Sequence, residues 1–451
     1  MSGMKILSML VFGALVGLMA CEQATPAENT IADYELANAW SDMTLYITKN
    51  TPANSPTYAS RGVGYIGLCM YESIVPGYDS HQSIQSQLNG LEGLPTVETD
   101  AEYFWPLALN AGQAQILRHI YNQTSDENKF SLDSLEQAFE AVYVDVVANK
   151  AVVDRSKTFG QQVADAIFEW SKTDGGHRGY LKNFDKDLVH PVRPGSWKPP
   201  LYAQSFSHHP LHPYWGENRT FLKQNTGLEL PYMIPYDTTE SSPYYQQFKA
   251  VYDTDLALTQ EQKEIAIWWG DDPDETFTPP GHSFYIASLV IDQKQPDLIT
   301  CAETFARVGL SVADAFINCW KWKYHFFSER PNTFIPQFID QEWESFWPDP
   351  PFPAFPSGHA IQAAAMATAL EGMYGPALTF IDSAHVGRER DEIRDVDFVE
   401  RPFTTFWGVA EETADSRFYG GIHTPQDNDI GLEEGKRIAG HVNALKWRRE
   451  E

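Results

Sequence analysis

Cysteine is scarce in this sequence of 451 residues, with only four occurrences. Cys21 ends an apolar N-terminal run, which leaves Cys69, Cys301 and Cys319 in the rest of the chain. Three cysteines cannot build a disulfide framework, and no pair has the spacing of a zinc site. Because all three lie in apolar segments with helical spacing, we expect them to be buried free thiols.

Basic residues are also in short supply. The chain has 33 Lys and Arg against 61 Asp and Glu, and its formal net charge is −28. This balance argues against a nucleic-acid-binding protein, so any strong anion site must be a local cluster of cations. A composition of 43% hydrophobic and 21% charged residues is that of a globular protein and excludes a largely disordered chain.

Long apolar runs are limited to residues 6–20, directly after Lys5. This run is short for a membrane span and is typical of a signal peptide. It ends in Leu-Met-Ala-Cys21, which resembles a bacterial lipobox. We therefore expect a signal peptide over 1–20, a lipidated Cys21, a flexible tether over 21–30 and a protein exported and lipid-anchored to the bacterial cell envelope, with no other membrane contact. The alternatives are an ordinary secreted protein and an apolar segment that remains as a membrane anchor. The sequence does not indicate which leaflet of the membrane carries the lipid.

Helical spacing of apolar residues dominates the rest of the chain, and strand alternation is scarce. The segments that show it are 32–47, 58–74, 104–121, 132–147, 152–170, 260–269, 282–291, 298–324, 357–373 and 427–445. A long stretch between the two groups of helices is rich in proline and aromatic residues.

These patterns predict an all-α fold in which two helical bundles pack within one domain, with long Pro- and aromatic-rich loops. The expected domain covers 31–451. It comprises an N-terminal bundle over about 31–175, a crossing loop over 176–259 and a C-terminal catalytic bundle over about 260–447.

Three short segments of the C-terminal half combine cations, histidines and small polar residues. In the first, six residues separate Lys323 from Arg330-Pro. The second is Pro-Ser357-Gly358-His359. In the third, five residues separate Arg417 from His423, and three more separate His423 from Asp427. Each segment alone is a weak signal, since such residues also occur on solvated helix faces. Their combination in this order is specific.

The ordered set resembles the signature of the type 2 phosphatidic acid phosphatase and vanadium haloperoxidase superfamily. The detailed resemblance covers about residues 320–427, and every signature position is occupied. It implies a helical double bundle and, for the haloperoxidases, vanadate as cofactor.

The residue types suit a tetrahedral oxyanion. Lys323, Arg330 and Arg417 supply three cations, and arginine can bind two oxygens at once. The hydroxyl of Ser357 and the backbone N–H of Gly358, at the start of a helix, add further donors.

The resemblance assigns the remaining roles. His423 is the axial vanadium ligand of a haloperoxidase or the nucleophile of a phosphatase, and Asp427 could orient its ring. His359 is placed for acid–base work, and Lys323 for polarising bound peroxide.

Aromatic residues favour the haloperoxidase branch. Trp320 and Phe352 resemble the halide-side wall of fungal vanadium chloroperoxidases, and we place His325 on the same side. We expect either Asp271 or Asp272 to support an active-site arginine, and the sequence does not distinguish between the two acids.

We therefore expect a vanadate-dependent haloperoxidase with hydrogen peroxide, a halide and small organic acceptors as partners. Iodide is the first expectation because it is the easiest halide to oxidise, with bromide and chloride as further candidates. An acid phosphatase with a phosphohistidine intermediate and a non-enzymatic surface scaffold are the alternatives. Oligomeric state and the organic acceptor stay open.

Overall fold

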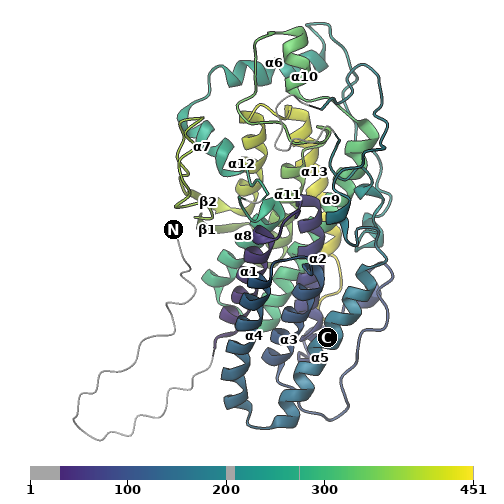
Figure 1. The fold of residues 1–451 in the computed structure, drawn as a ribbon, viewed down its shortest axis with the longest axis vertical. Coiled ribbons are helices and arrows are strands. Elements are labelled where there is room, and N and C mark those ends of the chain that lie inside the picture. Colours follow the sequence, from purple (N-terminus) through teal and green to yellow (C-terminus); the bar gives the residue numbers. More distant parts are fainter. Residues whose placement is uncertain (1–30, 200–208, 274, 450–451) are drawn as a thin grey trace, which may run out of the picture. The chain divides into compact units, whose positions relative to one another are not determined.

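The computed structural model describes residues 31–199, 209–273 and 275–449. The expected signal peptide, the expected tether and Cys21 lie outside these residues. The chain from Ile31 onward forms one compact unit, and its described part is mostly helical, which confirms the predicted all-α class (Figure 1).

The described residues form thirteen α-helices. They are α1 (Asp33–Asn50), α2 (Pro56–Glu72), α3 (Trp105–Ile120), α4 (Asp126–Val147), α5 (Lys150–Ser171), α6 (Pro243–Asp255), α7 (Gln260–Trp268), α8 (Thr278–Lys294), α9 (Leu298–Phe326), α10 (Pro331–Phe338), α11 (Gly358–Tyr374), α12 (Phe406–Tyr419) and α13 (Pro425–Asn443). Two short strands, β1 (Ala377–Asp382) and β2 (Arg401–Thr405), pair antiparallel.

Helix α9 is the central element of the core. It is 29 residues long, nearly all of its side chains are buried, and it packs against α2, α8, α11 and α13. Asp297 caps its first turn by accepting a hydrogen bond from the N–H of Thr300. An apolar surface on all sides is what a helix enclosed by others requires.

Glycines allow the helices around the site to pack closely. A Cβ at Gly309 of α9 would lie 2.4 Å from the carbonyl oxygen of Val63 in α2. A Cβ at Gly435 of α13 would lie 2.2 Å from the carbonyl oxygen of Ile361 in α11. Any larger residue would force these helix pairs apart.

In the described part of the stretch expected to be a crossing loop there is one α-helix, α6, which starts at Pro243 after the Ser242 cap. The small β1–β2 sheet is a second departure from a purely helical chain, and Asp382 at the end of β1 pairs in register with Arg401. Cys69, Cys301 and Cys319 are buried free thiols, as predicted. Within the described residues, no helix has both the length and the apolar character of a membrane span.

Candidate active site

Four helix ends meet at one place and bring the three sequence segments together. Lys323 lies in the last turn of α9 and Arg417 in the last turn of α12. Ser357 caps the start of α11, and His423 directly precedes the Thr424 cap of α13. The N–H of Ser357 donates to the carbonyl oxygen of Asp427 at 2.8 Å, which joins the starts of α11 and α13.

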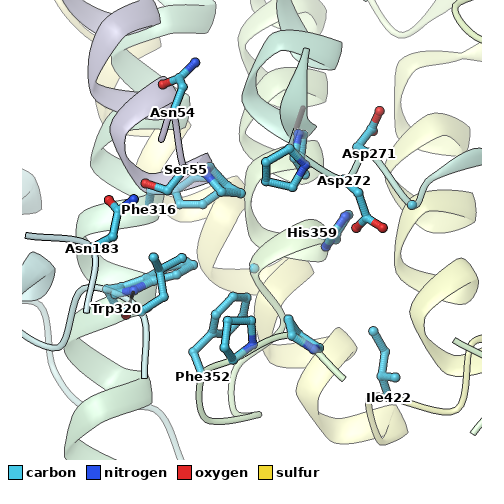
Figure 2. A pocket seen from close by; sticks show the side chains of 18 of the residues that line it. Asn54, Ser55, Asn183, Asp271, Asp272, Phe316, Trp320, Phe352, His359 and Ile422 are labelled. Carbon is cyan, nitrogen blue, oxygen red and sulfur yellow. Dashed lines mark hydrogen bonds between the residues drawn. The ribbon is translucent and has the colours of Figure 1, made fainter. Parts of the chain in front are cut away.

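A cavity of about 320 Å³ opens at this meeting point (Figure 2). Gly358, His359 and His423 contribute to its lining. Figure 2 shows Asp271, Asp272 and His359 on one side of it and Asn183, Trp320 and Phe352 on the other. The cavity is much larger than an oxyanion needs and leaves room for a further molecule.

The three cations are fully buried and fixed by main-chain carbonyls. Lys323 Nζ donates to Pro353 O at 3.0 Å and to Ala354 O at 2.6 Å. Arg330 Nε donates to Phe352 O at 3.0 Å, and its Nη1 donates to Ile422 O at 2.8 Å.

Arg417 is held by Ser416 and Ala266. Its Nε donates to Ser416 Oγ at 2.9 Å and its Nη2 to Ala266 O at 2.6 Å. These bonds occupy Nε and Nη2 of the guanidinium, while its buried Nη1 has no partner in the described structure. The Nε2 of His359 is also buried without a partner there. Buried polar atoms without a partner are costly, so both atoms indicate a polar ligand.

His423 has its ring orientation fixed from one side. Its Nδ1 lies 3.0 Å from Asp427 Oδ2, which also accepts from the N–H of Thr424 at 3.0 Å. Because a carboxylate only accepts, Nδ1 carries the proton and Nε2 keeps a lone pair. Arg330 Nη1 lies 3.4 Å from that Nε2.

Burial governs the protonation of the site. It lowers the pKa of Lys323 and Arg330, and it holds the pKa of His359 and His423 well below the usual range, with neighbouring cations adding to the effect on both rings. Burial raises the pKa of Asp427, against the opposing effect of its hydrogen bonds and nearby cations. The two rings are therefore neutral in the absence of an anion.

Trp320 and Phe352 form an aromatic part of the cavity wall. The rings of Trp320 and Phe352 are 5.0 Å apart between centroids, and both residues line the cavity. Lys323 Nζ lies 5.2 Å from the centroid of Phe352. An aromatic surface beside a cation is suited to a weakly hydrated anion, because it removes water without offering a competing acceptor.

His325 lies elsewhere, and its expected place on the halide side is wrong. Its side chain is exposed and lines a separate surface hollow with Tyr236 and Tyr244. The reason is helical geometry: a residue two positions beyond Lys323 is rotated by about 200° around the helix axis.

The two acids of the loop after α7 have different partners. Asp271 is hydrogen bonded to His282 and His385. Burial raises the pKa of Asp272 to about 7, and the charge of Arg417 is the main opposing influence. Burial lowers the pKa of Arg417 to about 10, and Asp272 opposes this more strongly than Asp271 does. Of the two acids, Asp272 therefore has the stronger electrostatic influence on this arginine.

Sequence reasoning missed one acid of the site. Asp349 is buried, and its charge is the strongest influence opposing the effect of burial on Arg330. It lies in the Pro-rich stretch before the Ser-Gly-His segment, where no local pattern distinguishes it from a loop acid.

The donor set fits vanadate. Three cations, the start of helix α11, two buried atoms without partners and one neutral imidazole match a tetrahedral oxyanion that would also take a nitrogen ligand. Lys323, Arg330, Arg417, Ser357 and Gly358 would hold its oxygens. His423 would ligate the vanadium.

Comparisons with known proteins agree with this geometry. Residues 336–448 match the family model described as the VCPO second helical-bundle domain. The chain is 27% identical to a solved structure described as the first bacterial vanadium-dependent iodoperoxidase, with a TM-score of 0.80 over 94% of this chain and 99% of that chain.

Two further structures share the fold. The holo-type bacterial vanadium-dependent chloroperoxidase is 15% identical, with a TM-score of 0.65 over 94% of each chain. The apo-type bacterial vanadium-dependent chloroperoxidase is 14% identical, with a TM-score of 0.67 over 88% of this chain and 94% of that chain. The comparison with curated proteins gives no significant match. Together, the domain match over residues 336–448 and the similarity to the iodoperoxidase show that the chain resembles the vanadium haloperoxidases and shares their fold.

Proposed function

We propose that the protein is a vanadate-dependent haloperoxidase that uses hydrogen peroxide to oxidise a halide to hypohalous acid. The observation that carries this proposal is the neutral His423, whose Nε2 lone pair lies among three buried cations while Asp427 holds the opposite ring nitrogen. Vanadate, when bound, would supply a Lewis-acid centre that activates peroxide.

The residues of the chain have separate tasks in this reaction. Lys323, Arg330 and Arg417 neutralise the oxyanion and hold its orientation. His359, whose low pKa keeps its ring neutral, has a free nitrogen that can accept a proton as hydrogen peroxide enters. Trp320 and Phe352 exclude water from the halide side.

Iodide is the halide that we propose as the preferred substrate. The support is the similarity to a bacterial iodoperoxidase, at 27% identity and a TM-score of 0.80. Small organic molecules would then be halogenated by the hypohalous acid that leaves the cavity.

The phosphatase alternative uses the same cradle, with His423 as nucleophile, and the comparisons do not favour it. The test measures iodide oxidation by hydrogen peroxide in vanadate-free protein, before and after vanadate is added. Phosphoester hydrolysis is measured on the same samples. We expect oxidation only with vanadate and little hydrolysis. Efficient hydrolysis without oxidation would contradict the proposal.

We also propose that the enzyme acts in the cell envelope, anchored by a lipid on Cys21. The support is the sequence alone, with its apolar run and the Leu-Met-Ala-Cys21 motif.

A further inference from the structure

Behind the cavity wall formed by the loop after α7, His282 lies between two buried carboxylates. Its Nδ1 is 2.8 Å from Asp271 Oδ2, and its Nε2 is 2.8 Å from Asp382 Oδ2. The Nε2 of His385 lies 3.0 Å from the other oxygen of Asp271. All four side chains are at most 3% exposed.

This arrangement fixes the charge of His282. Ionised carboxylates only accept hydrogen bonds, so both ring nitrogens of His282 must carry protons. Burial alone would lower the pKa of His282, but the charges of Asp271 and Asp382 outweigh it and raise the pKa to about 10. The same interaction lowers the pKa of both acids against the effect of burial. His385 and Tyr285 are the other titratable groups whose rings face the imidazole.

The imidazolium ties three segments together. Asp271 lies in the loop after α7, His282 on α8 and Asp382 at the end of β1. Asp382 also accepts from Nε1 of Trp268, the last residue of α7, at 2.8 Å. Asp271 has a positive φ of 48°, a left-handed conformation that side-chain hydrogen bonds stabilise. The backbone from residue 266 to 272 is thereby held at two points.

This 266–272 segment is in direct contact with the oxyanion site. The carbonyl oxygen of Ala266 accepts from Arg417 Nη2 at 2.6 Å. Asp271 and Asp272 both line the cavity, and their charges act on Arg417. Figure 2 shows both acids on the side of the cavity where His359 lies. A shift of the segment would therefore displace the arginine and the charge beside His359.

We propose that His282 is a positioning residue of the oxyanion site, an imidazolium that joins Asp271 to Asp382 and so holds the 266–272 segment that orients Arg417. The role in catalysis rests on the proposed function, but the role in anion binding does not.

The test replaces His282 by two amides that each keep one of its hydrogen bonds. In His282→Asn the amide nitrogen lies near the former Nδ1 and can still donate to Asp271. In His282→Gln it lies near the former Nε2 and can donate to Asp382 only. Binding of inorganic phosphate to vanadate-free protein is measured by calorimetry at pH 7. We expect about tenfold weaker binding in His282→Gln, the usual effect of losing a supporting partner, and a smaller loss in His282→Asn.

Tyr285→Phe is the matched control. Tyr285 lies on the same helix with its ring 6.0 Å from that of His282, but it has no hydrogen bond to Asp271 in the described structure. The phosphate affinity of the Tyr285→Phe variant should equal that of the unmodified protein. Equal affinity in His282→Gln as well would overturn the proposal.

A second measurement uses the unmodified protein, so it does not depend on whether a variant folds. Imidazole nitrogen NMR of histidine-labelled protein should show the ring of His282 doubly protonated at pH 8, where an exposed imidazole is neutral. A neutral His282, or a stoichiometric metal ion bound by Asp271, His282 and His385, would overturn the proposal. If the unmodified protein oxidises no iodide while the two amide variants differ in phosphate binding as expected, the proposed function fails and the positioning role stands.

Discussion

Asp427 Oδ2 accepts a hydrogen bond from His423 Nδ1 at 3.0 Å, one helical turn after the histidine. The same oxygen accepts from the N–H of Thr424, so the carboxylate is itself fixed by the start of α13. A histidine held in this way presents its other nitrogen as a ligand of defined direction.

Replacing Asp427 by Asn should weaken vanadate binding about 10–100-fold, because a neutral amide oxygen is a weaker acceptor for the ring N–H than a carboxylate and makes the ligating nitrogen less basic. The substitution keeps the volume of the side chain, so packing changes little. Vanadate affinity is measured by titrating vanadate-free protein and following the recovery of iodide oxidation. An affinity equal to that of the unmodified protein would mean that Asp427 serves only to cap α13.

His423→Ala should abolish peroxide-dependent turnover and leave the fold intact. The three cations and the N-terminus of α11 remain, so weak binding of phosphate should survive. Circular dichroism checks the fold, and calorimetry with phosphate checks the cradle. Iodide oxidation at a near-normal rate in this variant would remove His423 from the role of vanadium ligand.

Phe352→His should change the ratio of iodide to bromide oxidation more than it changes vanadate affinity. Phe352 lines the cavity beside Lys323, and a change of its side chain leaves in place the main-chain carbonyls that fix Lys323 and Arg330, including the carbonyl of Phe352 itself. A new imidazole there could donate a hydrogen bond to the halide or to peroxide. Steady-state rates with both halides, and the vanadate titration, give the two quantities. A collapse of vanadate affinity with an unchanged halide ratio contradicts the placement.

The ion pairs of His282 predict a pH-dependent difference in stability. The pKa of His282 is about 10 in the folded protein and close to 6.5 when unfolded, so the histidine binds its proton more tightly in the folded state. Its contribution is fully present below pH 6.5 and is lost as the pH rises towards 10. The free energy of unfolding of the unmodified protein should exceed that of His282→Asn by about 3–5 kcal/mol at pH 6. Urea unfolding of both proteins at pH 6 and pH 9.5 gives this difference in free energy of unfolding. A difference that stays constant or increases with pH would contradict the prediction.

Much of the architecture could be predicted because most helices bury large apolar faces at regular spacing. Helix α12 was missed since its buried face consists largely of small and polar residues such as Ala410, Thr413 and Ser416. Helix α6 was missed within a Pro-rich stretch, although Ser242 followed by Pro243 is a helix-start signal.

The site was predictable to the extent that its residues are close in sequence. His423 and Asp427 are one helical turn apart, so their pairing follows from local geometry. The contact between His282 and Asp382 joins residues 100 positions apart and depends on how α8 packs against β1, which no local pattern reports.

Cys21→Ser should release the protein from membranes if the lipid on this residue is the anchor. Cys21 lies outside the described residues, so the expectation comes from the sequence motif. Fractionation of cells that produce each form gives the answer. Unchanged retention would reject lipidation at Cys21 as the means of attachment.

The most direct measurement is a titration of vanadate-free protein with vanadate while iodide oxidation by hydrogen peroxide is followed. The account predicts activity that rises from near zero to a plateau at one vanadate per chain, that phosphate suppresses by competition, and that is absent in His423→Ala. Activity without vanadate, or a plateau that His423→Ala also reaches, would contradict it.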